Sequence, residues 1–219
     1  MRTIAKTISF LFHPLFILSY LFFILMLVNP YLFSLQDAQN KVLVLFSIIS
    51  LSVGFPLVVV ALFKMIGFIE SFEMQERTER IGPMIATSIF YLWLFLNVKD
   101  NPVFPKAYSI MVLGATIGLF VAFFINNFSK ISLHGVGVGG LVTDVFLIRF
   151  KFSYNYLIVE NLSIGNYQIH LNLLLYASLI IAGLVCSSRL YLNAHKRNDL
   201  YGGFLVGVLS QIIAFRVLI

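Results

Sequence analysis

The chain has 219 residues, of which 60% are hydrophobic and only 11% are charged, and its mean hydropathy is +0.96. A soluble globular domain carries about 25% charged residues, so this composition excludes one and predicts an integral membrane protein. The net charge of +6 favours anionic lipid or a phosphorylated ligand as a partner, and no nucleic-acid partner is expected. The single cysteine, Cys186, excludes a disulfide within the chain.

Apolar runs of about 20 residues recur along the whole sequence, and each is long enough to cross a bilayer as a helix. The seven expected spans are residues 8–28, 42–63, 81–98, 107–125, 135–149, 171–186 and 200–219. His13-Pro14 is expected to kink the first run. We interpret that run as a retained span rather than a cleaved signal peptide, because it reaches Val28 without a small-residue cleavage site. The expected fold class is an all-α, polytopic transmembrane helix bundle of six to seven spans, with residues 1–219 forming one domain.

Three of the connections are polar segments that follow the second, fourth and sixth spans: residues 70–80, 126–134 and 188–199. With seven spans, these three segments lie on the same side of the membrane, so the sequence predicts one composite site there. The connection 99–106 contains two prolines and is expected to be tight. The connection 150–168 carries Tyr154, Tyr156 and Tyr167, which is typical of a membrane-interface loop.

The third polar segment contains Ser188, Arg189, His195 and Asp199. His195 and Asp199 are four residues apart, so on a helix they share one face. The Asp199 carboxylate is then able to accept the Nδ1 proton of His195 and leave Nε2 free for nucleophilic attack or proton transfer. The guanidinium of Arg189 is a planar fork suited to phosphate oxygens. The alternative interpretation is an ordinary basic membrane boundary with an incidental His–Asp pair.

The spacing Ser-Arg-x5-His-x3-Asp of residues 188–199 resembles the third signature motif of the type 2 phosphatidic acid phosphatase family. The family's second motif, Pro-Ser-Gly-His, is similar to residues 131–134, where Ser132 and His134 match while Ile131 and Leu133 replace proline and glycine. The resemblance implies that His134 protonates the leaving alkoxide and that Ser132 binds phosphate. The alternative is that Ser132 caps the fifth helix and that His134 merely lies at the membrane interface.

Glycines spaced four residues apart occur in the fifth and last spans, as Gly135 with Gly139 and Gly203 with Gly207. Small residues at this spacing allow helices to approach closely. We therefore expect these two spans to pack together, which would bring His134 near His195.

The family's first motif, Lys-x6-Arg-Pro, is the least similar to this chain. Glu73 stands seven residues before Arg80, in place of the lysine, and Pro83 follows Arg80 by three residues. Arg77 and Arg80 are expected to lie on one helical face and to share the role of clamping phosphate, with Arg80 the phosphate ligand and Arg77 mainly a partner of Glu73. The alternative is a purely structural interfacial helix, held by the i,i+4 pairs Glu73–Arg77 and Glu76–Arg80.

Asp144 lies within the fifth span, where an acid is a functional candidate by default, and the preferred interpretation is a structural ion pair with Arg149. Lys130 is suited to neutralising phosphate or anionic lipid. His13 and His170 lie near span ends and are given no role.

The resemblance, which covers about residues 70–219, implies a membrane lipid phosphatase acting on a lipid phosphate or diphosphate through a phosphohistidine on His195, without a metal or other cofactor. The implied phosphate ligands are Arg189, Arg80, Arg77, Lys130, Ser132 and Ser188, and the implied catalytic residues are His195, His134 and Asp199. A non-enzymatic transporter or lipid translocase that uses the same intramembrane charges is the alternative. The identity of the lipid and the oligomeric state stay open.

Membrane orientation is predicted from the 15 lysines and arginines, nine on the side of the polar segments and six on the other side. This imbalance would place the site in the cytoplasm. However, Arg77, Arg80, Lys130 and Arg189 are candidate phosphate ligands, and without them the count is five against six. The resemblance then favours the bacterial cytoplasmic membrane with the site on the extracytoplasmic side.

Overall fold

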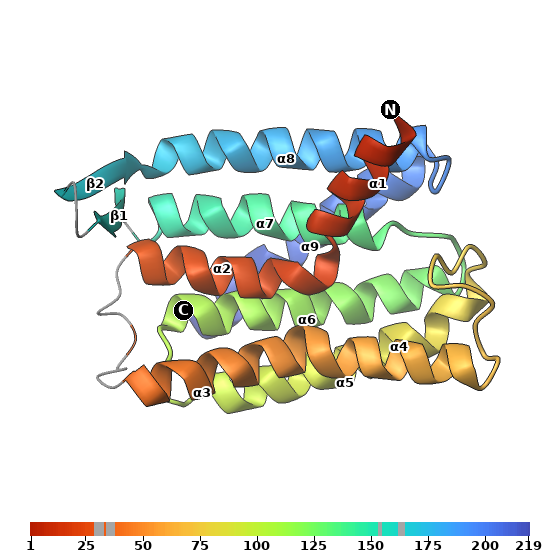
Figure 1. Ribbon diagram of the computed structural model, residues 1–219, viewed down its shortest axis with the longest axis horizontal. Coiled ribbons are helices and arrows are strands. Elements are labelled where there is room, and N and C mark those ends of the chain that lie inside the picture. Colours follow the sequence, from red (N-terminus) through yellow and green to blue (C-terminus); the bar gives the residue numbers. More distant parts are fainter. Residues whose placement is uncertain (29–32, 34–37, 153–154, 162–164) are drawn as a thin grey trace.

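The computed structural model describes residues 1–28, 33, 38–152, 155–161 and 165–219. The helices in chain order are α1 (Arg2–Leu11), α2 (Pro14–Val28), α3 (Ala38–Ile49), α4 (Phe55–Met65), α5 (Ile81–Val98), α6 (Lys106–Asn126), α7 (Leu133–Phe150), α8 (Leu171–Tyr191) and α9 (Arg197–Leu218). A π-helical turn, Ser50–Gly54, joins α3 to α4, and a 3₁₀ turn, Thr78–Arg80, leads into α5. The helices run roughly side by side as a bundle (Figure 1).

Among the described residues, six helical segments are long and apolar enough to cross a membrane, and the bent pair α1 and α2 makes a seventh if it is one span. The two helices of that pair meet at an angle of 57°. The bend falls at His13-Pro14, where the proline lacks the N–H needed to continue the helical hydrogen bonds. The all-α transmembrane bundle of six to seven spans is thus confirmed, and so is the kink.

The bundle has a buried centre and an apolar exterior. Fully buried side chains from α2, α6 and α7 form the main core, among them Leu21, Phe22, Tyr108 and Ile148. Large apolar side chains on the outer helices are exposed instead, as expected where helices face lipid. Examples are Val58, Trp93, Leu179 and Leu205.

The three polar segments gather at one end of the bundle, together with the N-terminus (Figure 1). Asn126 donates a hydrogen bond to the Arg77 carbonyl oxygen at 2.8 Å, and the Ser132 N–H donates to the Asp199 carbonyl oxygen at 3.1 Å. Each contact joins two of the three segments, so the prediction that they share one end is confirmed.

Helices α7 and α9 pack with their backbones in close contact at the glycines. A Cβ atom added to Gly135 would lie 2.9 Å from the Leu200 carbonyl oxygen, and one added to Gly139, Gly203 or Gly207 would collide with a carbonyl oxygen of the opposite helix or its N-cap. The glycine spacing predicted this packing, and the structure confirms it. The contact aligns the first turns of both helices, where His134 and Asp199 lie.

Two connections differ from the expectations. The connection 150–168 contains a strand, β1 (Tyr156–Asn161), that pairs antiparallel with β2 (Gly165–His170). The β-branched residues of β1 favour this hairpin, so the expected interface loop contains regular structure that was not predicted. Tyr154 lies outside the described residues. Within residues 70–80 only Thr78–Arg80 is helical, so Arg77 and Arg80 do not share one face of an interfacial helix.

Candidate active site

A cavity of about 540 Å³ opens among the three polar segments and extends into the bundle. Five basic side chains line it, Arg2, Lys6, Arg80, Lys130 and Arg189, as do the three histidines His13, His134 and His195. The two acidic residues that line it are Glu73 and Asp144. The cavity therefore carries a net positive charge, which favours an anionic ligand.

His195 is placed by the way in which α8 ends. The Ala194 N–H donates to the Arg189 carbonyl oxygen at 3.1 Å, the Asn193 N–H donates to the Leu190 carbonyl oxygen at 2.9 Å, and Asn193 has φ = +54°. This is the Schellman arrangement, in which a left-handed residue closes a helix. The chain then turns back, so His195 lies in the short connection before α9 rather than on a helix.

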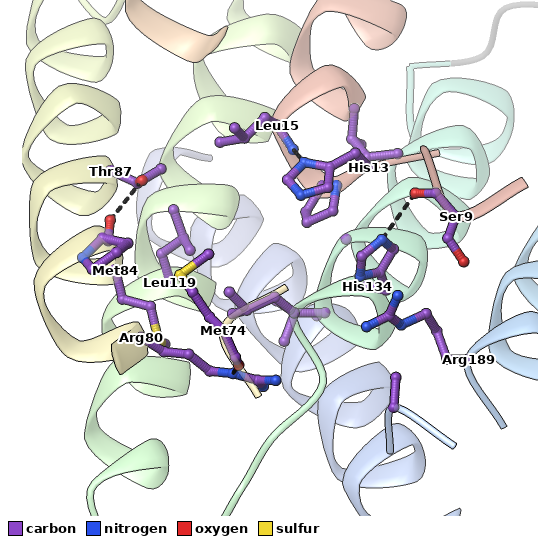
Figure 2. A pocket seen from close by; sticks show the side chains of 18 of the residues that line it. Ser9, His13, Leu15, Met74, Arg80, Met84, Thr87, Leu119, His134 and Arg189 are labelled. Atoms are coloured by element: carbon purple, nitrogen blue, oxygen red, sulfur yellow. Dashed lines mark hydrogen bonds between the residues drawn. The ribbon is translucent and has the colours of Figure 1, made fainter. Parts of the chain in front are cut away.

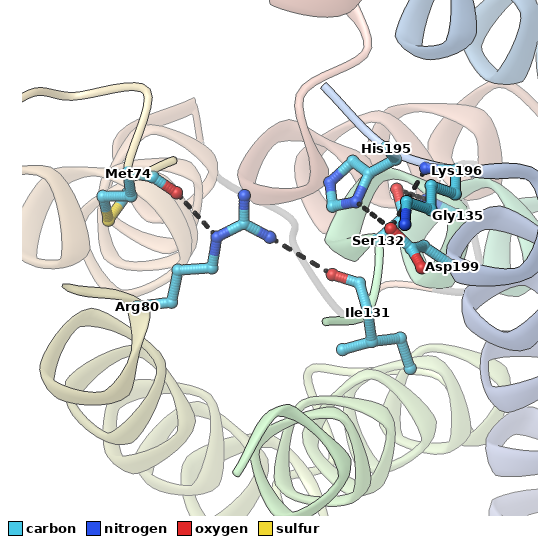
Figure 3. Close-up of polar contacts among 8 residues, drawn as sticks. All are labelled: Met74, Arg80, Ile131, Ser132, Gly135, His195, Lys196 and Asp199. Atoms are coloured by element: carbon cyan, nitrogen blue, oxygen red, sulfur yellow. Dashed lines mark hydrogen bonds and ion pairs between the residues drawn. The ribbon is translucent and has the colours of Figure 1, made fainter. Parts of the chain in front are cut away.

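The predicted pair of His195 and Asp199 forms by a different route from the one expected. Asp199 is in the first turn of α9, and its Oδ2 lies 3.3 Å from His195 Nδ1 while it also accepts the Lys196 N–H at 3.1 Å (Figure 3). The carboxylate caps the helix and holds the imidazole at the same time. Because a carboxylate accepts the hydrogen bond, Nδ1 carries the proton and Nε2 keeps its lone pair.

The surroundings of His195 keep its imidazole neutral. Burial, followed by the positive charge of Arg80, lowers the pKa of His195 from 6.5 to about 4, against the opposing effect of the Asp199 hydrogen bond. At neutral pH the Nε2 lone pair is therefore available for attack.

His134 is in the first turn of α7, below a cap that fixes its position. The Ser132 Oγ accepts the Gly135 N–H at 3.2 Å, which is the capping role considered for this serine. His134 is buried and lines the cavity, and its Nε2 lies 3.0 Å from the Ser9 carbonyl oxygen (Figure 2). Since a carbonyl oxygen only accepts, Nε2 carries the proton and Nδ1 is the second nitrogen available for proton transfer.

Arg80 spans the gap between the first and second polar segments. Its side chain is buried, its Nε donates to the Met74 carbonyl oxygen at 2.8 Å, and its Nη1 donates to the Ile131 carbonyl oxygen at 3.3 Å (Figure 3). A guanidinium has five N–H donors, so three remain beyond these two contacts. Arg80 thus lines the cavity. Its two contacts fix the plane of the guanidinium and leave its other N–H donors available to a ligand.

Arg77 has a different position from Arg80, because it is exposed and does not line the cavity. Its Nη1 donates to the Asn127 carbonyl oxygen at 2.8 Å, which links the first polar segment to the second. The expected partner, Glu73, lies instead 3.9 Å from Lys6 Nζ. The predicted Glu73–Arg77 pair is therefore wrong.

Arg189 and Lys130 supply further positive charge. Arg189 ends α8 with its guanidinium turned toward His134 (Figure 2), and its buried Nε has no hydrogen-bond partner within the described part of the chain. An unpaired buried donor is costly, and an anion in the cavity would satisfy it. Lys130 is half-buried, and burial followed by repulsion from Arg80 lowers its pKa.

The remaining predicted ligands lie beside the cavity rather than in it. Ser132, Ser188 and Asp199 are next to lining residues but do not themselves line it. Residues 126–134 and 188–199 thus contribute His134, His195, Arg189 and Lys130 to the cavity. Behind them, Ser132 caps α7 and Asp199 orients His195.

The N-terminal residues of the site could not be recognised from the sequence motifs. The His13 ring lies edge-on to the His134 ring, with centroids 5.2 Å apart, and the Ser9 carbonyl oxygen holds His134. Arg2 and Lys6 also line the cavity. The available signal was the His13-Pro14 break, since a broken span turns its first part across the end of the bundle, where it packs on α8.

The expected ion pair within α7 does not form. Arg149 donates through Nε to the Asn172 Oδ1 at 2.9 Å, and its guanidinium lies 5.2 Å from the centroid of the Phe150 ring. Asp144 is fully buried and lines the deep end of the cavity. The preferred interpretation of Asp144 as the partner of Arg149 is therefore wrong.

No family model matches the chain, and neither a curated protein nor a solved structure is significantly similar to it. Within the residues that the structure describes, no three side chains among His, Cys, Asp and Glu gather closely enough to hold a metal ion.

Proposed function

We propose that this protein is a membrane-embedded phosphatase that hydrolyses a lipid phosphate or diphosphate through a phosphohistidine on His195. The observation that carries the proposal is a buried His195 oriented by Asp199 at 3.3 Å, in a cavity that also presents Arg80, Arg189 and His134. Phosphoryl transfer to a histidine needs a neutral nucleophile, fixed cations around the phosphoryl oxygens, and an acid for the leaving group. These residues supply all three.

The first step is attack by His195 Nε2 on phosphorus. As the N–P bond forms, the bond from phosphorus to the lipid oxygen breaks. That oxygen takes a proton from Nδ1 of His134, which enters the step as the imidazolium that the negative charge of the bound phosphate stabilises, with its Nε2–H held by the Ser9 carbonyl oxygen. Asp199 stabilises the positive charge that develops on the His195 ring. Water then attacks phosphorus and gives a proton to Nδ1 of His134, while the N–P bond breaks, which returns the electron pair to His195 Nε2 and releases inorganic phosphate.

The two arginines stabilise the charge on the phosphoryl oxygens. Arg80 has three N–H donors beyond its contacts with Met74 and Ile131, and Arg189 has a buried Nε without a partner among the described residues. Donors fixed in a buried site are worth more than mobile ones, because they need no reorganisation as charge develops. Lys130 adds a positive charge, and Arg77 serves to hold the first two polar segments together.

The substrate class follows from the depth of the cavity. Below the basic residues it is lined by apolar side chains of the spans, including Leu18, Leu21 and Leu119, which suit a hydrocarbon chain. Phosphatidic acid, phosphatidylglycerol phosphate, a polyprenyl diphosphate and a lipid A phosphate all fit this description. In this proposal the protein lies in the bacterial cytoplasmic membrane with the site on the extracytoplasmic side, and its motifs are those of type 2 phosphatidic acid phosphatases in altered form.

The test is phosphate release by the purified protein from each of these lipids, dispersed in detergent. We expect vanadate to inhibit, since it mimics the pentacoordinate phosphoryl group, and EDTA to have no effect. Loss of activity in EDTA that a divalent ion restores would show a metal-dependent phosphatase instead.

A second candidate function is transport of an anionic lipid across the membrane. The observation that favours it is Asp144, a fully buried acid without a partner within the described residues, in the same cavity. Such intramembrane acids line substrate and ion pathways in transporters. Movement of a labelled lipid phosphate between leaflets of proteoliposomes, without release of phosphate, would favour this function over hydrolysis.

A further inference from the structure

The deep end of the cavity has a chemistry opposite to that of its basic end. Asp144 lies ten residues after His134 on α7, which is about 15 Å along a helix that rises 1.5 Å per residue. We propose that Asp144 and Gln211 form a binding site for a monovalent alkali cation inside the membrane. The inference goes beyond the proposed hydrolysis and does not depend on it.

Unpaired acceptor oxygens are the first observation. Asp144 is 0% exposed and Gln211 is 2% exposed, and both line the cavity. Both carboxylate oxygens of Asp144 and the Oε1 of Gln211 have no hydrogen-bond partner within the described part of the chain. The Gln211 Nε2 donates to the Met111 carbonyl oxygen at 3.2 Å, which fixes the amide with its oxygen as the free end.

The second observation is that two glycines leave space for the side-chain amide of Gln211. A Cβ atom on Gly114 of α6 would collide with Gln211 Oε1, and one on Gly140 of α7 would lie 3.6 Å from Gln211 Nε2. Gly140 is one helical turn before Asp144, so the amide lies between α6 and α7 about one turn from the carboxylate. The amide and the carboxylate thus line the same part of the cavity.

The chemistry of these oxygens selects the occupant. A single deprotonated carboxylate with a neutral amide has a charge of −1, which one monovalent cation balances when it takes the place of the proton, and oxygen atoms are the ligands that hard cations prefer. The hydrocarbon chain of a lipid has no donors to offer. A headgroup amine is bound close to its phosphate, so it cannot reach a group about 15 Å from the histidines.

The test is thermal unfolding of the purified protein in detergent, followed by tryptophan fluorescence in sodium, potassium or choline chloride at equal concentration. A ligand that binds only the folded state raises the melting temperature. We expect sodium or potassium to raise it relative to choline, and Asp144→Asn to abolish this increase. The matched control is Asp100→Asn, which removes an exposed acid outside the bundle and should keep the full increase.

A second measurement uses the wild-type chain alone, in case Asp144→Asn does not fold. Dicyclohexylcarbodiimide enters membranes and modifies protonated carboxyl groups, and mass spectrometry locates the adduct. We expect an adduct on Asp144 that forms at least about fivefold more slowly when the favoured cation is present. Equal melting temperatures in all three salts together with unchanged labelling would overturn the proposal, and so would an increase that persists in Asp144→Asn. Phosphate release is not a readout in either experiment, so failure here leaves the proposed hydrolysis standing.

Discussion

The two sides of the basic cavity are built in different ways. On one side, α7 and α9 pack through glycines, and their first turns carry His134 and Asp199 on regular, capped helices. On the other side, residues 70–77 have no regular helix, and Arg80 is held by carbonyl oxygens of Met74 and Ile131. The first side places its groups through helix geometry, and the second places one arginine through individual hydrogen bonds.

This difference bears on which substitutions the site tolerates. A residue on the helical side is placed by many backbone contacts, so removing its side chain removes chemistry with little change in shape. A residue on the irregular side helps to hold its own segment in place. Replacing it therefore shifts the segment as well as removing the functional group of the side chain. The predictions below test this contrast, from the largest expected effect to the smallest.

The largest effect is expected at the proposed nucleophile, His195, which lies in the connection before α9 and is held by Asp199 of the helical side. His195→Ala should reduce phosphate release to background, a loss of at least about 10⁴-fold, which is the size seen when a covalent nucleophile is removed. Asp199→Asn should reduce it less, because Nε2 survives on a ring that is less well fixed. Rates with a dispersed lipid phosphate measure both. Near wild-type turnover by a folded His195→Ala protein would remove His195 as the nucleophile.

On the irregular side, Arg80→Lys and Arg77→Lys form a matched pair. Lysine keeps the charge but cannot donate to two carbonyl oxygens and a phosphoryl group from one plane, so Arg80→Lys should lower turnover about 10²-fold. Arg77 contacts only the Asn127 carbonyl oxygen from an exposed position, so Arg77→Lys should change turnover less than about threefold. A larger loss in Arg77→Lys than in Arg80→Lys would reverse the two assignments.

The helical side was also the side that the sequence predicted best. The apolar runs, the kink at His13-Pro14 and the glycine spacing each depend on local, periodic features, and each is confirmed. The pairing of His195 with Asp199 was predicted although its geometry was not, because a spacing of four residues also fits a helix cap preceded by a turn.

The irregular side could not be predicted for a physical reason. The i,i+4 charges of residues 70–80 favour a helix locally, yet the Glu79 carboxylate accepts the N–H groups of Glu70 at 2.6 Å and Glu76 at 3.4 Å and folds the segment back. The roles of Ser9, His13 and Gln211 likewise depend on contacts between residues more than 90 positions apart, such as His134 with Ser9. No local pattern encodes such contacts.

A smaller effect, on stability, is expected from the glycine packing. Gly203→Ala places a methyl group against the Ser132 carbonyl oxygen, so it should separate α9 from the N-terminus of α7 and lower the free energy of unfolding by about 1–3 kcal/mol. Gly202→Ala is the matched control, because nothing lies within 4 Å of its added Cβ and alanine favours a helix over glycine by up to about 1 kcal/mol. Thermal unfolding in detergent measures both, and equal changes in the two variants would contradict the close packing.

The last prediction, whose effect is absent at neutral pH, is a dependence of stability on pH that originates at His195. Its pKa is lowered to about 4 in the folded protein, chiefly by burial and then by Arg80, while an imidazole in an unfolded chain has a pKa of about 6.5. Between these two values the unfolded chain binds more protons than the folded one, so the free energy of unfolding decreases as the pH falls from about 6.5 to about 4. Above pH 6.5 the contribution of His195 is fully present.

His195→Gln isolates this contribution, since glutamine keeps a polar side chain at the position but does not titrate. Melting temperatures are measured from pH 7.5 to pH 4, each relative to the value of the same variant at pH 7.5. The wild-type protein should lose about 3 kcal/mol more than His195→Gln over this range, because each unit of pKa difference is worth about 1.4 kcal/mol. For a chain of this size that loss corresponds to roughly 6–12 °C. The matched control is Arg80→Gln, which removes the positive charge next to the imidazole, raises the pKa of His195 toward its usual value and should weaken the pH dependence without abolishing it. If wild type and His195→Gln lose stability equally, His195 is not the buried neutral imidazole that the proposed attack on phosphorus requires.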